Sequence, residues 1–417
     1  MMKVVLVSHS DLIGGASVVT YRLMHALRSE GVDARMLVFN KVSDDDNVLQ
    51  VGSSQSRKFH FLAERARIAV ANGFSRKNLF KVSIANSGLN LHTHPLILDA
   101  DVIVLNWINQ GLLSLDGISK LCRLNKPIVW TMHDMWCLTG ICHHAYECTR
   151  YSQQCGKCPF LIGNNPHDLS YKTWKKKKNL FDNNRITFVS VSHWLAECSR
   201  ISPLLSPKCD IRVIHNAFPA DSFTTHPDKT ITALQAAPGK NLIIMGAARL
   251  DDPIKGLDYA IDALNYLSDN NKDISSSSLA IFFGSIRNRA ILDRLRFPHV
   301  FLDHVSDPEL LRNIYAGSKV VLSTSLYETL PGTLIEGQAS GCLPVTFGRG
   351  GQSDIVTHLK DGYIAKYKDS RDIAEGIIWA LNQNPDREKL HESVVNRFAS
   401  SHIARQYISL FHELLNR

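Results

Sequence analysis

Short apolar runs alternate along the chain with longer segments in which apolar residues recur at helical spacing. The first run, Val4 to Val7, is a predicted strand, and the polar loop that follows it ends in Gly14 and Gly15. Apolar residues over 18–27 then share one face of a predicted helix, and Ala34 to Phe39 forms the next strand. A strand, loop, helix and strand in this order predict a parallel, doubly wound sheet.

The alternation continues through most of the chain. Further strands are predicted over 102–105, 128–131, 186–191, 211–214, 242–246, 279–283, 300–302, 320–322 and 343–347. Further helices are predicted over 117–124, 257–267, 309–315, 371–383 and 401–415, and a short one begins near Thr333. The stretch Asn40 to Leu98 is polar and aromatic without a clear period, and we expect helical connections there.

A break in this alternation divides the chain into two α/β domains. Residues 219–240 are rich in Pro, Thr, Asp and Ala, which is typical of a linker. The sequence therefore predicts an N-terminal domain over 1–218 and a second doubly wound domain over 241–396. The final amphipathic helix, within 397–417, is expected to cross back to the first domain. Ligands of open parallel sheets bind beyond the carboxyl ends of strands, so we expect a cleft between two such edges.

Composition narrows the class of protein. Of 417 residues, 44% are hydrophobic and 21% charged, as in globular proteins, and no apolar run is long enough to cross a bilayer. The first residues lack the pattern of a secretory signal, so we expect a cytoplasmic protein. A net charge of +8 favours anionic partners. The run Lys175, Lys176, Lys177 and Lys178 is either a solvated helix face or a peripheral contact with the inner face of an anionic membrane.

Charged side chains follow two predicted strands of the second domain. Arg249 and Lys255 come after the strand at 242–246, and Glu328 and Glu336 frame the turn and helix after the strand at 320–322. A guanidinium, an ammonium and the amides of a helix N-terminus are the groups that bind a diphosphate. A carboxylate beside them can accept hydrogen bonds from sugar hydroxyls. Solvated surface charges remain the alternative at each of these positions.

These motifs occur in an order that resembles family 4 glycosyltransferases. Five features carry the resemblance, which extends over nearly the whole chain: Gly14-Gly15, His133-Asp134, Val213-Ile214-His215-Asn216, Arg249-x5-Lys255-Gly256 and Glu328-x7-Glu336. The resemblance implies the GT-B fold, in which two doubly wound domains face each other across a cleft. It also implies a transferase that retains the anomeric configuration, needs no catalytic metal, and uses a nucleotide-activated sugar such as a UDP- or GDP-sugar.

The resemblance also implies a role for each site residue. His133 and Glu328 would be the catalytic residues, in contact with the donor sugar and, for His133, the acceptor. Glu336 would hold the ribose hydroxyls. The donor diphosphate would be bound by Gly14, Gly15, Arg249, Lys255, Thr333 and Leu334. The chain has no Asp-x-Asp motif near a predicted strand end that would hold a divalent ion, and the run Asp44 to Asp46 is more typical of a turn.

Five of the nine cysteines fall in an insertion over 137–160. Within it, Cys142, Cys148, Cys155 and Cys158 have the spacing C-x5-C-x6-C-x2-C, which is looser than that of a standard zinc finger. Four thiolates in a short segment favour a structural zinc site, with His143 and His144 as alternative ligands. Free structural thiols or a redox-active C-x-x-C would also fit this spacing. The segment is similar to cysteine-bearing segments of transferases that build exopolysaccharides such as colanic acid.

The sequence therefore predicts a glycosyltransferase that acts on a growing glycan, for example a lipid-linked one, in the synthesis of a bacterial surface polysaccharide. One alternative is another enzyme of the same fold, a nucleotide-sugar epimerase. A phosphorylase would need a longer chain and a lysine-bound pyridoxal cofactor. A second alternative is a non-enzymatic, zinc-bearing binding module. Aromatic residues interleaved with basic ones at a repeated spacing, as nucleic-acid binding modules have them, are absent, so we expect no nucleic-acid partner.

Overall fold

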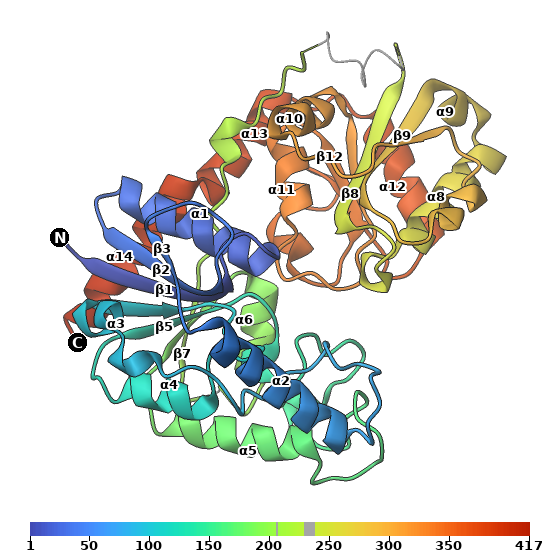
Figure 1. Ribbon diagram of the computed structural model, residues 1–417. Helices are drawn as coiled ribbons and strands as arrows, with labels where there is room; N and C mark the ends of the chain where they lie inside the picture. Colours follow the sequence, from blue (N-terminus) through green and yellow to red (C-terminus); the bar gives the residue numbers. More distant parts are fainter. Residues whose placement is uncertain (206, 229–237) are drawn as a thin grey trace. The chain divides into compact units, whose positions relative to one another are not determined.

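The computed structural model describes residues 1–205, 207–228 and 238–417. This part of the chain forms two compact units, residues 1–217 with 400–417 and residues 218–399 (Figure 1). Part of the linker predicted over 219–240, namely 229–237, lies outside the described residues. No described helix combines the length and the apolar character needed to cross a lipid bilayer.

The first unit is built on a seven-stranded parallel sheet with the order β3-β2-β1-β4-β5-β6-β7. Its strands are β1 (Lys3–Ser10), β2 (Asp33–Asn40), β3 (Val48–Gln50), β4 (Val102–Leu105), β5 (Ile128–Met132), β6 (Thr187–Ser190) and β7 (Asp210–Val213). Its helices are α1 (Gly15–Ser29), α2 (Ser54–Ala71), α3 (Pro95–Asp99), α4 (Leu115–Cys122), α5 (Leu169–Asp182), α6 (His193–Arg200) and α14 (Ser400–Leu415). The strand order reverses between β1 and β4, which defines the topological switch point of this sheet.

Helices cover both faces of this sheet. Alternate strand residues such as Val4, Leu6 and Val104 pack against α1 and α14 in one core cluster. On the opposite face, the Trp130 ring of β5 lies against the Phe181 ring of α5, with ring centroids 6.1 Å apart. A parallel strand that is buried on both faces needs apolar residues at every position, which accounts for the uninterrupted apolar runs in the sequence.

The second unit has a six-stranded parallel sheet with the order β10-β9-β8-β11-β12-β13. Its strands are β8 (Asn241–Arg249), β9 (Ser278–Ser285), β10 (His299–Phe301), β11 (Val320–Ser323), β12 (Leu343–Phe347) and β13 (Tyr363–Ala365). Its helices are α8 (Leu257–Asn270), α9 (Lys272–Ser277), α10 (Pro308–Gly317), α11 (Gly332–Ala339), α12 (Ser370–Asn382) and α13 (Arg387–Phe398). The switch point of this sheet lies between β8 and β11.

Helix α11 packs unusually close to its sheet. A Cβ atom added at Gly337 would lie 2.5 Å from a side-chain carbon of Val321 in β11, so only glycine allows this approach. The α8 and α12 helices contribute Leu264 and Ile377 to the main core cluster of the unit. The helix that opens the candidate site is therefore held firmly against the strand that precedes it.

The fold class predicted from the sequence is confirmed, since both sheets are parallel and doubly wound. Almost every predicted strand and helix is present within two or three residues of its predicted bounds. The helices α5, α6, α9 and α13 and the short edge strand β13 were not predicted, and β3 and α2 were left unresolved within Asn40 to Leu98. Short edge strands give weak periodic signals because few of their residues are buried.

Helix α14 belongs to the first unit, although it comes last in the chain. Its Tyr407 hydroxyl lies 3.0 Å from the Thr131 hydroxyl of β5, and Phe411 is fully buried in the first core. On the outer side, Glu413 accepts a hydrogen bond from Arg212 of β7 at 2.7 Å. The first sheet thus depends on a helix supplied from the far end of the sequence.

We predict that Phe411→Ala lowers the free energy of unfolding by about 3–5 kcal/mol, because it leaves a cavity under the first sheet. Urea denaturation followed by circular dichroism measures this. Leu415→Ala, at a 43% exposed position of the same helix, is the matched control and should change stability by no more than about 0.5 kcal/mol. Equal effects of the two substitutions would contradict the packing role of α14.

Candidate functional site

The loop after β1 brings two glycines to the start of α1. Gly14 has a φ of 88°, in the left-handed region, and a Cβ atom added at Gly14 or Gly15 would meet nothing within 4 Å. Asp11 ties this loop to the residues that follow β2. Its buried carboxylate accepts hydrogen bonds from the amides of Val42 and Ser43 at 2.9 and 2.8 Å. Helix α1, which has fifteen residues, therefore begins at two residues that have no side chains, so its N-terminal amides are not covered by side chains of these two residues.

His133 lies directly after β5 and is oriented by a residue that follows β4. One of its ring nitrogens, Nε2, is 3.0 Å from the side-chain oxygen of Asn106. Burial lowers the pKa of His133 to about 4, although the nearby charge of Asp134 acts in the opposite direction. The imidazole is therefore neutral at neutral pH and can serve as a hydrogen-bonding group rather than as a cation.

Next to His133 the structure assembles a cluster that the sequence analysis did not foresee. The Asp134 carboxylate accepts hydrogen bonds from the Trp107 indole at 2.9 Å and from the Trp136 amide at 2.8 Å, and it pairs with Nδ1 of His143 at 2.7 Å. Burial alone would raise the pKa of Asp134, but the charge and hydrogen bond of His143 hold it at about 2. The Nε2 atom of His143 is buried and has no hydrogen-bond partner among the described residues.

The sequence suggested His143 as an alternative zinc ligand, but its Nδ1 atom is paired with the carboxylate of Asp134. Because Nδ1 of His143 is bound to a carboxylate, this histidine has the arrangement of an oriented acid–base or hydrogen-bonding group. The signal in the sequence was the pair His133-Asp134 followed nine residues later by a second histidine. Nothing in that spacing showed which histidine Asp134 would contact.

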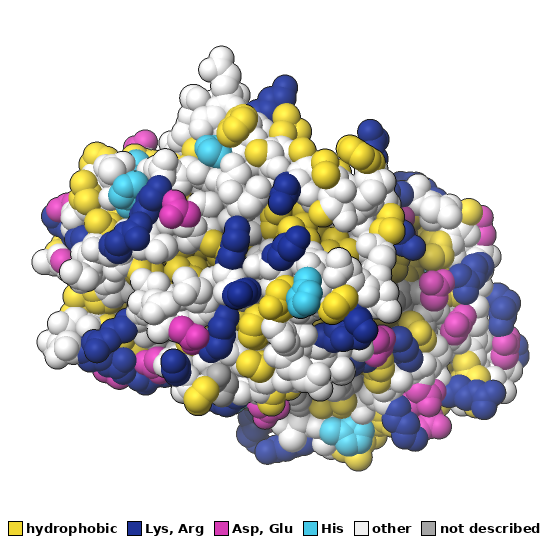
Figure 2. Space-filling model, turned by 90° about the horizontal axis from the view of Figure 1, so that it is seen from below, with side chains coloured by type: hydrophobic (Ala, Val, Ile, Leu, Met, Phe, Trp, Pro, Cys, Tyr) yellow, Lys and Arg dark blue, Asp and Glu magenta, His cyan; other side chains and the backbone are white. Residues whose placement is uncertain are grey.

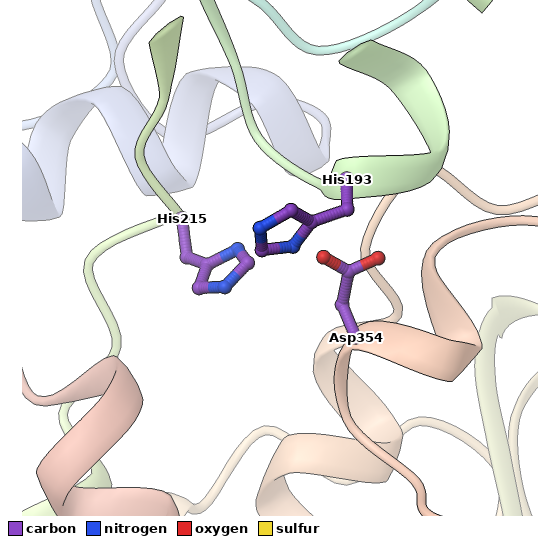
Figure 3. A group of neighbouring side chains, drawn as sticks. All are labelled: His193, His215 and Asp354. Atoms are coloured by element: carbon purple, nitrogen blue, oxygen red, sulfur yellow. The ribbon is translucent and has the colours of Figure 1, made fainter. Parts of the chain in front are cut away.

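Two further histidines lie after the strands β6 and β7. His193 begins α6 behind its cap Ser192, and His215 follows β7 and has its Nδ1 2.9 Å from the carbonyl of Val191. Their ring centroids are 5.8 Å apart, and Figure 3 shows the two rings beside each other. His215 belongs to the motif at 213–216, so this part of the motif also ends at the carboxyl edge of the first sheet.

In the second unit, Arg249 is the last residue of β8 and Lys255 follows the strand, and both cations are paired with carboxylates. Arg249 forms ion pairs with Asp252 at 2.8 Å and with Asp251 at 3.5 Å. The ammonium of Lys255 lies 2.5 Å from the carboxylate of Glu328. The charge of Glu328 raises the pKa of Lys255, and burial opposes this, so the lysine is cationic at neutral pH. The structure therefore brings together two residues that lie far apart in the sequence.

The glycine-rich segment after β12 completes the surroundings of Glu328. The backbone of Glu328 bridges Gly350, and its carbonyl accepts a hydrogen bond from the Gly351 amide at 2.9 Å. A Cβ atom at Gly350, where φ is 135°, would lie 2.2 Å from that carbonyl oxygen. Arg349 stacks over the rings of Tyr327 and Tyr367, 4.9 and 4.5 Å from their centroids. The sequence analysis missed Arg349, although Gly-Arg-Gly-Gly directly after a strand was a usable signal.

Helix α11 carries the remaining predicted residues of this unit. Glu336 is half-buried and accepts a hydrogen bond from the buried Tyr315 hydroxyl at 3.0 Å. Thr333 lies in the first turn, whereas the Leu334 side chain is fully buried and its amide donates to the Pro331 carbonyl at 3.2 Å. Leu334 therefore contributes mainly to packing, and the amides of Gly332 and Thr333 form the leading end of the helix.

The lysine run in the first unit needs one correction. Lys175 and Lys176 are exposed and Lys178 pairs with Asp182 at 2.6 Å, but Lys177 is fully buried. Its ammonium donates to the carbonyls of Trp136 and Thr139. The prediction that all four lysines form one surface was therefore wrong at Lys177, because the helical period turns this position into the core.

Parts of the chain are similar in sequence to known proteins. Residues 228–397 match the family model described as glycosyl transferases group 1. The WcaC protein of Escherichia coli (strain K12), a candidate colanic acid biosynthesis glycosyl transferase, is 32% identical over 95 residues, which make up 21% of this chain and 22% of that protein.

Solved structures resemble the whole chain, and two of them serve as examples. HepE from Anabaena, solved in complex with UDP and glucose, has a TM-score of 0.61 at 14% identity, and the match covers 99% of this chain and 100% of HepE. A glycosyltransferase from Rickettsia africae has a TM-score of 0.66 at 15% identity, over 100% and 99% of the two chains. The chain has the GT-B fold. The match to the family model falls within the second unit.

We predict that Asp134→Asn lowers the free energy of unfolding by about 2 kcal/mol at pH 7. This is the free energy that corresponds to the lowering of the Asp134 pKa from its ordinary value of 3.8 to about 2. A lowered carboxyl pKa stabilises the fold at pH values above 3.8, and this contribution is lost as the pH falls towards about 2. Urea denaturation at several pH values should therefore show the two proteins converging in acid. Asp46→Asn, at an exposed position, is the control, and a constant difference between wild type and Asp134→Asn at all pH values would contradict the prediction.

Proposed function

We propose that the protein is a group 1 glycosyltransferase that moves a sugar from a nucleotide-sugar donor to a growing glycan acceptor. The observation that carries this proposal is the cluster at the carboxyl ends of β8 and β11. There the Lys255–Glu328 pair, the start of α11 and Glu336 lie within the domain that matches the family model. Solved relatives of the same fold include one with bound UDP and glucose, which favours a UDP-sugar donor over a GDP-sugar.

The chemistry of the transfer gives a reason for the cationic character of this cluster. When the sugar leaves, negative charge grows on the diphosphate, and fixed positive groups stabilise that charge without rearrangement. Lys255 and Arg249, with the amides of Gly332 and Thr333, would provide such a site, and the carboxylate of Glu328 holds the lysine ready. We infer that these groups take the place of a catalytic metal ion.

The remaining donor contacts follow from the same arrangement. Glu336 would accept hydrogen bonds from the ribose hydroxyls, and Tyr315 fixes its orientation through their hydrogen bond. On the first sheet, the backbone at Gly14 and Gly15 and the neutral His133 would serve the donor phosphate and the acceptor. Retention of the anomeric configuration is part of the proposal and rests on the resemblance to family 4 transferases.

Two observations support a proposal about the pathway in which the protein acts. The similarity to WcaC and the cysteine-bearing insertion both favour the synthesis of a bacterial surface polysaccharide of the colanic acid type. A lipid-linked acceptor would place the protein at the cytoplasmic face of a membrane. We therefore propose a peripheral membrane contact, but centre it on α2 and the loop after it rather than on the lysine run.

The α2 surface exposes large apolar side chains that a soluble domain normally buries. Phe59 is 65% exposed, Phe74 78% and Phe80 62%, and Leu62, Val70 and Ile162 are also exposed. Over residues 54–83 the exposed charges are all positive, because the one acidic residue, Glu64, is buried and paired with Arg65. Figure 2 shows Lys and Arg side chains interspersed with hydrophobic ones on the face of the first unit that is seen from below. Apolar anchors among cations fit an anionic lipid surface.

To test the transfer activity, the purified protein is incubated with UDP- and GDP-sugars and a glycan acceptor, and nucleoside diphosphate release is measured. We expect Lys255→Ala to lower kcat/KM by about 10²–10³-fold, as for loss of a group that stabilises the leaving charge. Glu336→Gln should raise the donor KM about tenfold. Lys360→Ala and Glu375→Gln, at exposed positions of the same unit, are the controls and should retain full activity.

Three outcomes would overturn parts of this proposal. No diphosphate release with any donor, together with no effect of the substitutions on nucleotide binding, would exclude the transferase. Interconversion of the nucleotide sugar without release would indicate an epimerase. Inversion of the anomeric centre, seen in the nuclear magnetic resonance spectrum of the product, would exclude retention.

To test the membrane contact, the protein is sedimented with vesicles of anionic phosphatidylglycerol and of neutral phosphatidylcholine. We expect binding to the anionic vesicles only, and a loss of about tenfold or more in the Phe59→Ser, Phe74→Ser double variant, since each buried Phe contributes about 1.5–3 kcal/mol. Ile201→Ser, at an equally exposed position of the first unit, is the control. Equal binding of the double variant and the control would contradict the α2 surface.

A further inference from the structure

Four cysteines of the insertion surround one small cavity in the first unit. Cys142, Cys148, Cys155 and Cys158 all line it, together with Gly140 and Ser170. The cavity has a volume of about 20 Å³, enough for one particle the size of a water molecule or an ion. All four thiols are free in the structure. Four cysteines that are separated in the sequence therefore line one small cavity.

Hydrogen bonds link the segments that line this cavity. The Gly140 amide donates a hydrogen bond to the sulfur of Cys155 at 3.1 Å, and a Cβ atom at Gly140 would lie 2.6 Å from the Ser170 carbonyl oxygen. The Cys158 amide donates to Asp168 at 2.7 Å. The same Asp168 carboxylate caps α5 by accepting a hydrogen bond from the Ser170 amide at 2.8 Å. The C-x-x-C segment is therefore tied to the beginning of α5.

A buried cation lies beside the cysteines. The ammonium of Lys177 donates to the carbonyls of Trp136 at 2.6 Å and Thr139 at 3.1 Å, and forms no ion pair with a carboxylate among the described residues. Burial lowers the pKa of Lys177 to about 7, and the ionisable groups that act most strongly in the opposite direction are Cys137, Cys142 and Cys155. A buried ammonium without a counter-charge is costly, and neutral thiols do not supply one.

We propose that Cys142, Cys148, Cys155 and Cys158 bind one zinc ion as four thiolates. Zinc prefers tetrahedral thiolate sets in structural sites, and four thiolates around Zn²⁺ carry a net charge of about −2, which the single positive charge of Lys177 partly offsets. Bonds of about 2.3 Å place tetrahedral sulfurs about 3.8 Å apart. No three of these sulfurs lie within 4.8 Å of one another in the described chain, so we expect the metal to draw the loop inward.

The site connects the insertion to the strand-end cluster of the first sheet. The backbone of Cys142 bridges Val82, and its neighbour His143 holds Asp134 at 2.7 Å and receives the Met135 amide on its carbonyl at 2.8 Å. Closing the four sulfurs around a metal would therefore fix the segment that positions the Asp134–His143 pair. The zinc has a structural role, since four protein ligands leave no open position for a reacting group.

The direct test is metal analysis of the full chain purified without chelator. We expect one zinc per chain, and its loss in Cys142→Ser and Cys155→Ser. Cys209→Ser, at a half-buried cysteine outside the cavity, is the control and should retain the zinc. Wild-type protein without zinc, or zinc retained in both cavity variants, would overturn the proposal.

Two further measurements keep the test valid if the cysteine variants fail to fold. Wild-type protein loaded with Co²⁺ should show the intense charge-transfer and d–d absorption of a tetrahedral thiolate site, and the weak bands of octahedral cobalt would overturn the proposal. Lys177→Met should weaken zinc binding by about 10–100-fold in competition with a chelator, whereas the exposed Lys176→Met should not. Equal zinc affinities of these two variants would contradict the charge-balancing role of Lys177.

Discussion

Parallel strand pairing is the constraint on which the rest of this structure depends. Within each sheet every strand runs in the same direction, so all the strands of that sheet end at the same edge. Each return connection must cross a face of the sheet, which covers both faces with helices and forces the strands to be apolar throughout. Polar residues gather in the loops at this edge of each sheet. Gly14 and His133 lie at the edge of the first sheet, and Arg249 and Glu328 lie at the edge of the second.

Charge compensation decides how the groups at these edges are arranged. The carboxylate of Asp134 is matched by His143, Lys255 is matched by Glu328, and the buried Glu64 is matched by Arg65. A buried charge without a partner costs several kcal/mol, so such pairs are the arrangement that a folded chain can tolerate. Lys177 lacks a carboxylate of this kind among the described residues, and it is also the cation that lies against the cysteine cavity. A thiolate metal site would supply the negative charge that this buried ammonium requires.

The two units contribute different chemistry to the proposed reaction. The second unit gathers cations and a helix N-terminus around Glu328, as the binding of a diphosphate requires. The first unit gathers neutral or paired imidazoles around Asp134 and supports them with the cysteine-bearing insertion. Its α2 surface also offers apolar anchors among cations. This division is consistent with a donor that is a soluble nucleotide and an acceptor that is carried on a lipid.

The sequence by itself determined the fold class, nearly all strand positions and the list of charged residues at strand ends, because burial on both faces imposes a pattern that can be read locally. It also pointed to the group 1 glycosyl transferase domain, which the match over 228–397 supports, through motifs that keep their order. Only the tertiary structure decided which groups meet. The pairing of Lys255 with Glu328 spans 73 residues, and that of Asp134 with His143 rather than His144 depends on the path of one loop. The burial of Lys177 likewise followed from the rotation of α5 against its sheet, since a run of four lysines has no periodicity from which its inward-facing member can be identified.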